Sequence, residues 1–340
     1  MMSKKISTVN NKNTPRVGLA VVFAALGKEE ENSVVEMWAA AGKMEKSWQP
    51  AFCEFTIDPL KASAEDLDVL VYLGESSRFE RVAGKLSEQV PVVFVKSTVE
   101  ELMEWPQASA RRYRMSTGVN GIARALAAAA PLVPSVDWTT LPWPHDLLPH
   151  IYLDEAEGRY VNKSLGAFRH AVEARGAAWL NGLPAGNAPF SVFLTMHDPA
   201  AALLAEAALS LWPQCTVITA DGMVSTVSPS GKPWLERLIR VRHWSPQVPS
   251  HSNQLFRQVL NGEALPDFDS PGMTFGTLVF LDHAFKAGAG AHHLDSAGKQ
   301  PGPNGNMQMT VSGMSDPERL ILFRGDRMEI AEIASLESGK

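Results

Sequence analysis

The sequence predicts an α/β protein: an N-terminal doubly wound (Rossmann-like) parallel sheet, followed by a C-terminal α+β domain with a large, mostly antiparallel sheet. Short apolar runs at residues 69–73 and 90–95 alternate with polar, helix-compatible segments, as strands buried on both faces of a parallel sheet do. The chain opens in the same way, with an apolar run at 16–23, helical spacing over 28–44 and a second strand at 51–57. A right-handed doubly wound sheet is the simplest topology for this order.

The second half of the chain predicts a more varied set of elements. Five prolines from Pro131 to Pro149 indicate a linker or a pocket-lining loop. We place the domain boundary there and expect a polar tail at 1–14, a first domain at 15–135 and a second at 136–340. The pair Asp221-Gly222 favours a hairpin over 216–227. The remaining expected elements are strands at 190–195 and 235–244, helices at 162–180, 252–260 and 273–287, and a final hairpin of 307–311 with 319–323. Residues 200–211 have helical composition, with a strand as the alternative.

Composition narrows the class of protein. The chain has 340 residues, 45% of them hydrophobic and 20% charged, with a net charge of −6. That charge argues against a nucleic-acid partner, and no window approaches 18 consecutive apolar residues, so we expect no membrane span. The polar opening, residues 1–16, lacks an apolar signal core and favours a cytoplasmic location. In a reducing compartment Cys53 and Cys215 are expected to be buried free thiols.

The carboxyl ends of the predicted parallel strands indicate where a small-molecule site would lie. In doubly wound sheets ligands bind outside these ends, and Gly74, Ser76 and Lys96 fall there. Lys96 would donate a hydrogen bond or proton to a substrate oxygen, and the alternative is a solvated lysine at the sheet edge.

Two histidine-containing groups are further candidates. His170 and Glu173 would share a helix face and act as general acid and base; the alternative is a surface ion pair, which the nearby Arg169 favours. The run His292-His293 with Asp295 has metal-ligand chemistry. Adjacent histidines in a strand point to opposite faces, so we interpret the run as a solvated turn and expect no metal site.

The order of these features resembles the Gfo/Idh/MocA oxidoreductase family. Val95-Lys96-Ser97 stands where that family has Glu-Lys-Pro, and residues 115–120, ending in Gly118-Val119-Asn120, match its short strand ending Gly-x-Asn. Residues 164–173 are similar to a later helix of the family, residues 179–182 to the Trp-Leu-x-Gly that follows it, and residues 251–288 to its closing helix pair. The resemblance implies an NAD- or NADP-dependent oxidoreductase that forms homo-oligomers and acts on a small hydroxylated, sugar-like or imine substrate. It implies catalytic Lys96, His170 and Glu173, and cofactor-binding Gly18, Ala24, Asp58, Gly74, Ser76 and Asn120.

Departures from the family pattern keep other functions open. After Gly18 the next glycine is Gly27, whereas a dinucleotide fingerprint needs close-set glycines. A periplasmic-binding-like or sugar-isomerase-like module binds ligands without such glycines, and a non-catalytic subunit would retain the fold for assembly. The second sheet separates these hypotheses. A long sheet from 190–195, 216–227 and 235–244 favours the oxidoreductase, and a second parallel doubly wound sheet favours the binding module.

Overall fold

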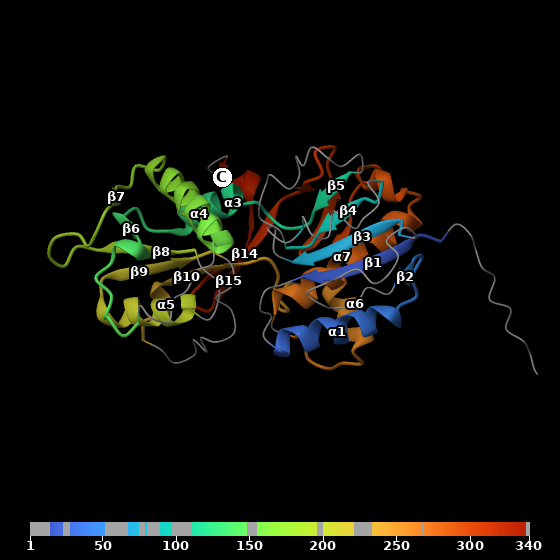
Figure 1. The fold of residues 1–340 in the computed structure, drawn as a ribbon, viewed down its shortest axis with the longest axis horizontal. Helices are drawn as coiled ribbons and strands as arrows, with labels where there is room; N and C mark the ends of the chain where they lie inside the picture. The colour runs from blue at the N-terminus through green and yellow to red at the C-terminus, as the bar shows by residue number, and fades with distance from the viewer. Residues whose placement is uncertain are drawn as a thin grey trace, which may run out of the picture.

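The structure, a computed structural model, describes residues 14–22, 28–51, 67–74, 79, 89–96, 111–147, 155–195, 200–220, 233–266 and 268–337. These residues form two lobes side by side, each built on its own β-sheet, together with a small third sheet (Figure 1). No described helix combines the length and the hydropathy that crossing a bilayer requires.

The first lobe is built on a five-stranded sheet in which every pairing is parallel. Its order is β2-β1-β3-β4-β5. The two central strands are almost entirely buried because both faces of the sheet are covered, which explains their continuous runs of Val and Leu. The strands are β1 Arg16–Val22, β2 Gln49–Ala51, β3 Val69–Gly74, β4 Val92–Phe94 and β5 Arg112–Arg114.

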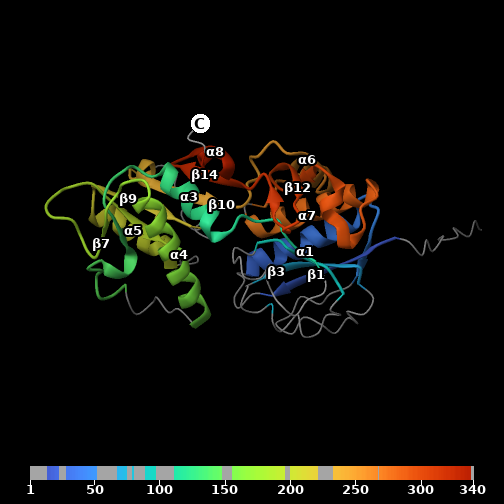
Figure 2. The same ribbon diagram turned by 90° about the horizontal axis from the view of Figure 1, so that it is seen from above.

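Three helices cover one face of this sheet: α1 Lys28–Gly42, α6 His251–Val259 and α7 Asp269–Lys286. Helix α7 is buried on nearly every side, as expected of a helix that is apolar all round. It contacts α1 and β3 on the sheet side and η7 (Ala291–Ala297) and β11 on the other. The layers are visible in Figure 2. The third sheet consists of β11 Gln300–Gly302, β12 Gly305–Met309 and β13 Ser315–Asp316.

The second lobe is built on a seven-stranded mixed sheet of order β15-β14-β10-β9-β8-β6-β7. The pairings from β10 through β9, β8 and β6 to β7 are parallel, and β14 and β15 extend the sheet in antiparallel fashion. The strands are β6 Ser135–Asp137, β7 Trp179–Leu180, β8 Phe190–Leu194, β9 Cys215–Thr219, β10 Leu238–Arg242, β14 Arg319–Arg324 and β15 Arg327–Glu332.

Helices cover both faces of the second sheet. Helices α3 Val119–Ala129 and α4 Glu155–Glu173 pack on one face, where the rings of Phe168 and Phe193 stack with centroids 5.1 Å apart. Helix α5 Ala200–Leu211 packs on the other face. The remaining short helices are η4 Trp138–Thr140, η6 Leu235–Arg237 and α8 Ile333–Glu337.

The predicted fold class is confirmed, since the protein is α/β with an N-terminal parallel sheet and a second, larger sheet. The expected mostly antiparallel character of the second sheet is wrong. Helix α5 carries the chain from β8 back to a parallel β9, which is the connection that parallel pairing requires. The final hairpin is also wrong, because β12 pairs with β11 and β13 while β14 pairs with β10 and β15. The hairpin predicted around Asp221 lies outside the described residues.

The chain passes between the lobes three times. Strands of the first sheet precede residue 115, and those of the second begin at residue 135. Helices α6 and α7 and the third sheet then return to the first lobe, before β14 and β15 complete the second. The crossing segments are residues 115–118, 243–250 and 317–318.

Candidate functional site

The parallel strands of both sheets end at edges that face each other. Strand β5 leaves the first sheet at its carboxyl end and reaches α3 of the second lobe through residues 115–118. Strand β10 leaves the second sheet at its carboxyl end and reaches α6 of the first lobe through residues 243–250. Because all parallel strands of a sheet end at one edge, the ligand-binding edges of both sheets border this region (Figure 1). We call it the interlobe junction.

On the first-lobe side, β3 ends at a position that only glycine fits. A Cβ on Gly74 would lie 2.5 Å from the carbonyl oxygen of Val22 and 2.8 Å from the hydroxyl oxygen of Tyr72. The next strand continues past Phe94 to Lys96, which is partly buried. Val93 and Val95 face the α7 core, so alternation places Phe94 and Lys96 on the opposite face.

Arg114, the last residue of β5, is the buried cation of this edge. It pairs with Phe94 in the strand ladder, and its side chain is 2% exposed. Its Nη2 donates to Oε1 of Glu318, in the third crossing segment, at 3.1 Å and contacts the sulfur of Met314 at 3.2 Å. Its Nε and Nη1 have no hydrogen-bond partner within the described structure. A guanidinium carries five N–H donors, so this one keeps capacity for an anionic group.

On the second-lobe side, hydroxyl groups stand at the ends of two neighbouring strands. Thr219 ends β9, and Thr195 follows directly after β8. Both residues are 1% exposed, and neither hydroxyl has a hydrogen-bond partner in the part of the chain that the structure describes. The ends of β8 and β9 in the second lobe therefore offer neutral hydroxyl groups, whereas the ends of β4 and β5 in the first lobe offer the cations Lys96 and Arg114.

A buried ion pair anchors the second crossing segment. Arg242, the last residue of β10, donates from Nε to Oδ1 of Asp269 at 2.9 Å, and the backbone N–H of His243 donates to Oδ2 at 2.9 Å. Asp269 lies in the first turn of α7, where the helix dipole favours a carboxylate. The end of the second sheet is thus bound to the central helix of the first lobe.

The structure separates the residues that the sequence proposed as a catalytic group. Lys96 and Gly74 lie at the junction edge of the first sheet. His170 and Glu173 are exposed in the last turn of α4. The amino end of α4 faces the junction, so this last turn lies away from it. Glu173 forms an ion pair with Arg169 at 3.0 Å. The surface ion pair, the alternative reading, is therefore what the structure contains at that position.

The predicted cofactor residues do not form one site within the described structure. Gly18 lies inside β1, paired with Ala51 and Leu70, so its backbone cannot approach a pyrophosphate. Asn120 is exposed in the first turn of α3. Ala24, Asp58 and Ser76 lie outside the described residues.

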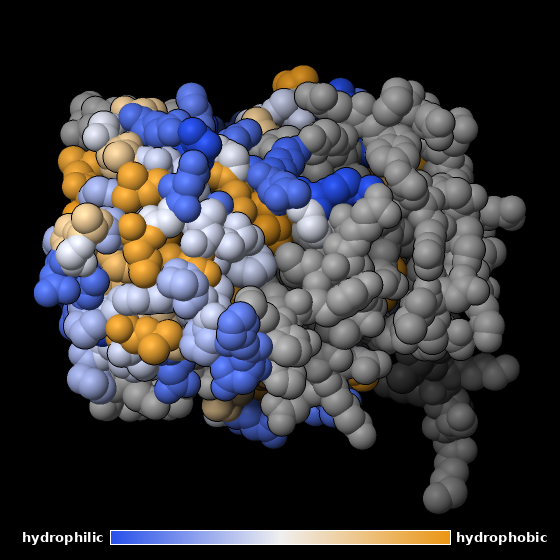
Figure 3. Space-filling view, turned by 60° about the vertical axis from the view of Figure 1, so that its left-hand side comes forward, coloured by the Kyte–Doolittle hydropathy of each residue, from blue (hydrophilic) through white to orange (hydrophobic). Residues whose placement is uncertain are grey.

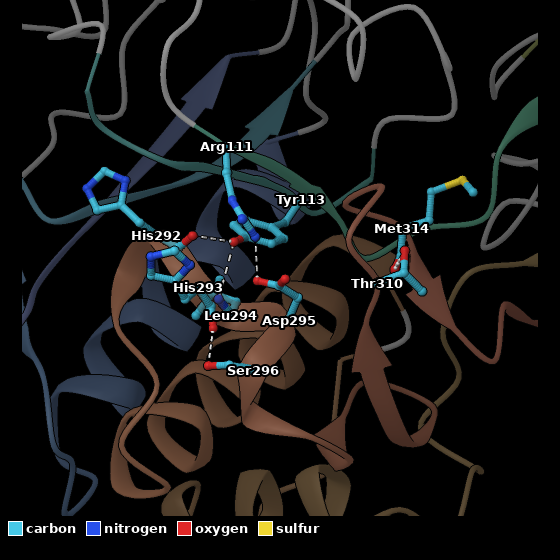
Figure 4. Close-up of polar contacts among 9 residues, drawn as sticks. All are labelled: Arg111, Tyr113, His292, His293, Leu294, Asp295, Ser296, Thr310 and Met314. Atoms are coloured by element: carbon cyan, nitrogen blue, oxygen red, sulfur yellow. Dashed lines mark hydrogen bonds and ion pairs between the residues drawn. The ribbon is translucent and has the colours of Figure 1, made fainter.

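The run His292-His293 with Asp295 belongs to a structural contact (Figure 4). Asp295 accepts a hydrogen bond from Nη1 of Arg111 at 2.7 Å. The hydroxyl of Tyr113 donates to the carbonyl of His292 and accepts from the N–H of Leu294. These bonds fasten η7 to β5. Among the residues that the structure describes, no three potential ligands cluster as a metal site.

Comparison with known proteins identifies the fold. No family model matches the chain, and no curated protein matches it. Among solved structures, an ABC transporter substrate-binding protein from Desulfitobacterium hafniense in complex with Leu matches with a TM-score of 0.63 at 13% identity, over 93% of this chain and 99% of that one. The chain has the fold of type 1 periplasmic binding proteins.

Other solved structures share this fold. A solute-binding protein from Rhodopseudomonas palustris BisB5, in complex with 3,4-dihydroxybenzoic acid, matches with a TM-score of 0.64 at 12% identity, over 91% of this chain and 92% of that one. A type 1 periplasmic binding protein from Bordetella pertussis matches with a TM-score of 0.59 at 10% identity, over 94% of this chain and all of that one.

These matches correct several expectations. The resemblance to Gfo/Idh/MocA oxidoreductases is wrong, because the matching structures are substrate-binding proteins and the second sheet continues in parallel from β8 to β10. The NAD or NADP cofactor was implied by that resemblance alone and is withdrawn with it. The expected cytoplasmic location is corrected as well, since proteins with this fold include a periplasmic one. The expected self-association stays a prediction.

Sequence reasoning missed Arg114 and Thr195. Arg114 ends a short alternating strand, and Thr195 directly follows a short apolar one. Their polarity at these positions was the signal in the sequence. Large exposed hydrophobic residues of the second lobe gave no competing site. These residues include Leu132, Leu183, Leu203 and Leu211. In the view of Figure 3, hydrophobic residues stand in several groups among hydrophilic ones.

Proposed function

We propose that the protein binds a small organic carboxylate between its two lobes. The observation that carries the proposal is the meeting of two parallel-sheet carboxyl edges at the interlobe junction, with three crossing segments as the connection. A ligand held there contacts both lobes, so its binding energy is coupled to their relative position. This is the binding-module hypothesis that the sequence left open.

The charge of the first-lobe edge supports an anionic ligand group. Lys96 and Arg114 lie on the same sheet face, and Arg114 keeps two guanidinium nitrogens without partners in the described part of the protein. Arginine and lysine favour carboxylates. The two ligand-bound structures compared above hold leucine and 3,4-dihydroxybenzoic acid, which both carry a carboxylate.

The test is a thermal-shift screen of the full chain with aliphatic amino acids, plain and hydroxylated benzoates and 2-oxo acids, followed by calorimetry of any hit. A ligand at about 100 times its dissociation constant stabilises the fold by about 2.7 kcal/mol. Lys96→Gln is expected to weaken binding of a hit by about tenfold. The matched control is Lys299→Gln, an exposed lysine beside β11. A screen without any hit contradicts the proposal. Equal affinity of the two variants for a hit contradicts the assignment of Lys96 to the carboxylate.

A further inference from the structure

Four buried hydroxyl groups of the second lobe lack a hydrogen-bond partner within the described structure: those of Ser164, Ser191, Thr195 and Thr219. Two of them lie toward the junction on the sheet face that α4 covers, Ser164 of α4 and Thr195 after β8, and each of these residues is 1% exposed. Buried polar atoms are nearly always hydrogen-bonded, and leaving one unpaired destabilises the fold. The hydroxyl groups of Ser164 and Thr195 are therefore available to a polar group from outside the protein.

The hydroxyl of Ser164 also lacks the hydrogen bond to the carbonyl four residues earlier that a buried hydroxyl in a helix usually makes. In α7, Thr274 and Thr277 each donate to the carbonyl four residues earlier, at 2.7 and 2.8 Å. This is the ordinary way to satisfy a buried Ser or Thr within a helix. The hydroxyl of Ser164 makes no such bond, so it remains available to a group outside its own helix.

The stacked rings of Phe168 and Phe193 show that Ser164 and Thr195 lie at one level. Ser164 is one turn before Phe168, about 6 Å along a helix whose amino end faces the junction. Thr195 is two residues beyond Phe193, about 6.6 Å along a strand whose carboxyl end faces the junction. Phe193 and Thr195 share the face that α4 covers. Both hydroxyls are therefore displaced toward the junction by the same distance from the ring pair.

We propose that Ser164 and Thr195 form a hydroxyl subsite that selects ligands with a hydrogen-bonding group remote from the carboxylate. The inference rests on the proposed function and deepens it: the first lobe holds the carboxylate, and the second lobe holds a hydroxyl or carbonyl at the other end. A Ser and a Thr hydroxyl can each donate and accept, so either kind of group satisfies them.

The experiment measures discrimination between matched ligands by calorimetry with the full chain. The pairs are benzoate against 4-hydroxybenzoate and leucine against its near-isostere asparagine. The test variant combines Ser164→Ala with Thr195→Val. The control is Ser191→Ala, because Ser191 lies on the same strand and face as Thr195, is also buried and also lacks a hydroxyl partner in the described region. It stands at the amino end of β8, away from the junction.

We expect the wild type and Ser191→Ala to prefer the polar member of a pair, and the double variant to lose about five- to tenfold of that preference. Binding with an unchanged preference in the double variant overturns the subsite and leaves the proposed function intact. Binding of no carboxylate by the wild type overturns both.

Stability without ligand gives a second measurement. If the two hydroxyls are unpaired in the free protein, their removal leaves the melting temperature unchanged or raises it by a few degrees. A fall of several degrees means that the hydroxyls already bond within the protein, which overturns the subsite.

Discussion

The indole of Trp244 lies directly against the backbone of Gly272. A Cβ on Gly272 would be 2.1 Å from Cδ2 and from Cε2 of the ring, so no other residue fits without displacing the tryptophan. Trp244 belongs to the second crossing segment, and its Nε1 donates to Oδ1 of Asn253 at 2.8 Å. The contact therefore packs the second crossing segment, residues 243–250, directly against α7 of the first lobe.

Gly272→Ala is expected to destabilise the protein by about 1–3 kcal/mol, because the added methyl group overpacks a buried contact. Urea unfolding would measure the change. Gly166→Ala is the matched control, since Gly166 is an exposed residue of α4 whose added Cβ would meet nothing within 4 Å. Its replacement should stabilise the helix by about 0.5–1 kcal/mol. Equal effects of the two substitutions would contradict the packing argument.

Asp269→Asn is expected to destabilise the protein by about 3–5 kcal/mol, because it removes the carboxylate that accepts from the buried guanidinium of Arg242. The side chains of the pair are 6% and 1% exposed. Glu173→Gln breaks the exposed pair with Arg169 and should change the free energy of unfolding by less than about 1 kcal/mol. Chemical unfolding of both variants makes the comparison. A loss below about 1 kcal/mol in Asp269→Asn would show that the buried pair does not anchor the crossing segment.

The stability of the protein should fall above pH 9 through Cys215. Burial raises the pKa of this thiol from its ordinary value of 9.0 to about 12. The unfolded chain then loses the thiol proton as the pH passes 9, while the folded chain keeps it until about 12. Folding stability is therefore complete below pH 9 and declines between pH 9 and 12. Unfolding of the wild type and of Cys215→Ala at several pH values should show a shallower decline in the variant; parallel curves would contradict the assignment.

A fragment ending at residue 135 should not fold alone. Its first sheet would lack α6 and α7, and the apolar side chains of β1, β3 and β4 that face these helices would be exposed. Circular dichroism, dye binding and size-exclusion chromatography of the fragment should show no cooperative melting transition and strong binding of a hydrophobic dye. A cooperative transition would mean that the sheet is stable without its covering helices.

Local sequence patterns predicted the strands and helices that bury continuous apolar surface. The runs at 16–23, 69–73 and 90–95 coincide with β1, β3 and β4, and the helical composition at 200–211 coincides with α5. Strand β5 was missed because arginines alternate in it. Arg112 is nevertheless 9% exposed, with its guanidinium 5.3 Å from the ring centroid of Phe79. A charged side chain that stacks on an aromatic ring looks like a surface residue in sequence.

Local sequence patterns could not predict which strands and helices lie beside one another. Alternation indicated strands at 307–311 and 319–323, but it does not say which strand lies beside which, and the adjacent pair proved to belong to different sheets. The orphan hydroxyl groups of Ser164 and Thr195 depend on the depth at which α4 packs on β8. At that depth the ring of Phe168 stacks on the ring of Phe193, and no spacing rule connects these two residues.

The three crossing segments also impose an order on the nascent chain. The first sheet leaves the ribosome long before α7 does, because the strands and helices of residues 115–242 lie between them. At about 5–20 residues per second, synthesis from residue 115 to residue 286 takes about 10–30 s. During that interval the face of the sheet that α7 will cover is open to water and to other chains. We expect the growing chain to be most prone to aggregation in this period.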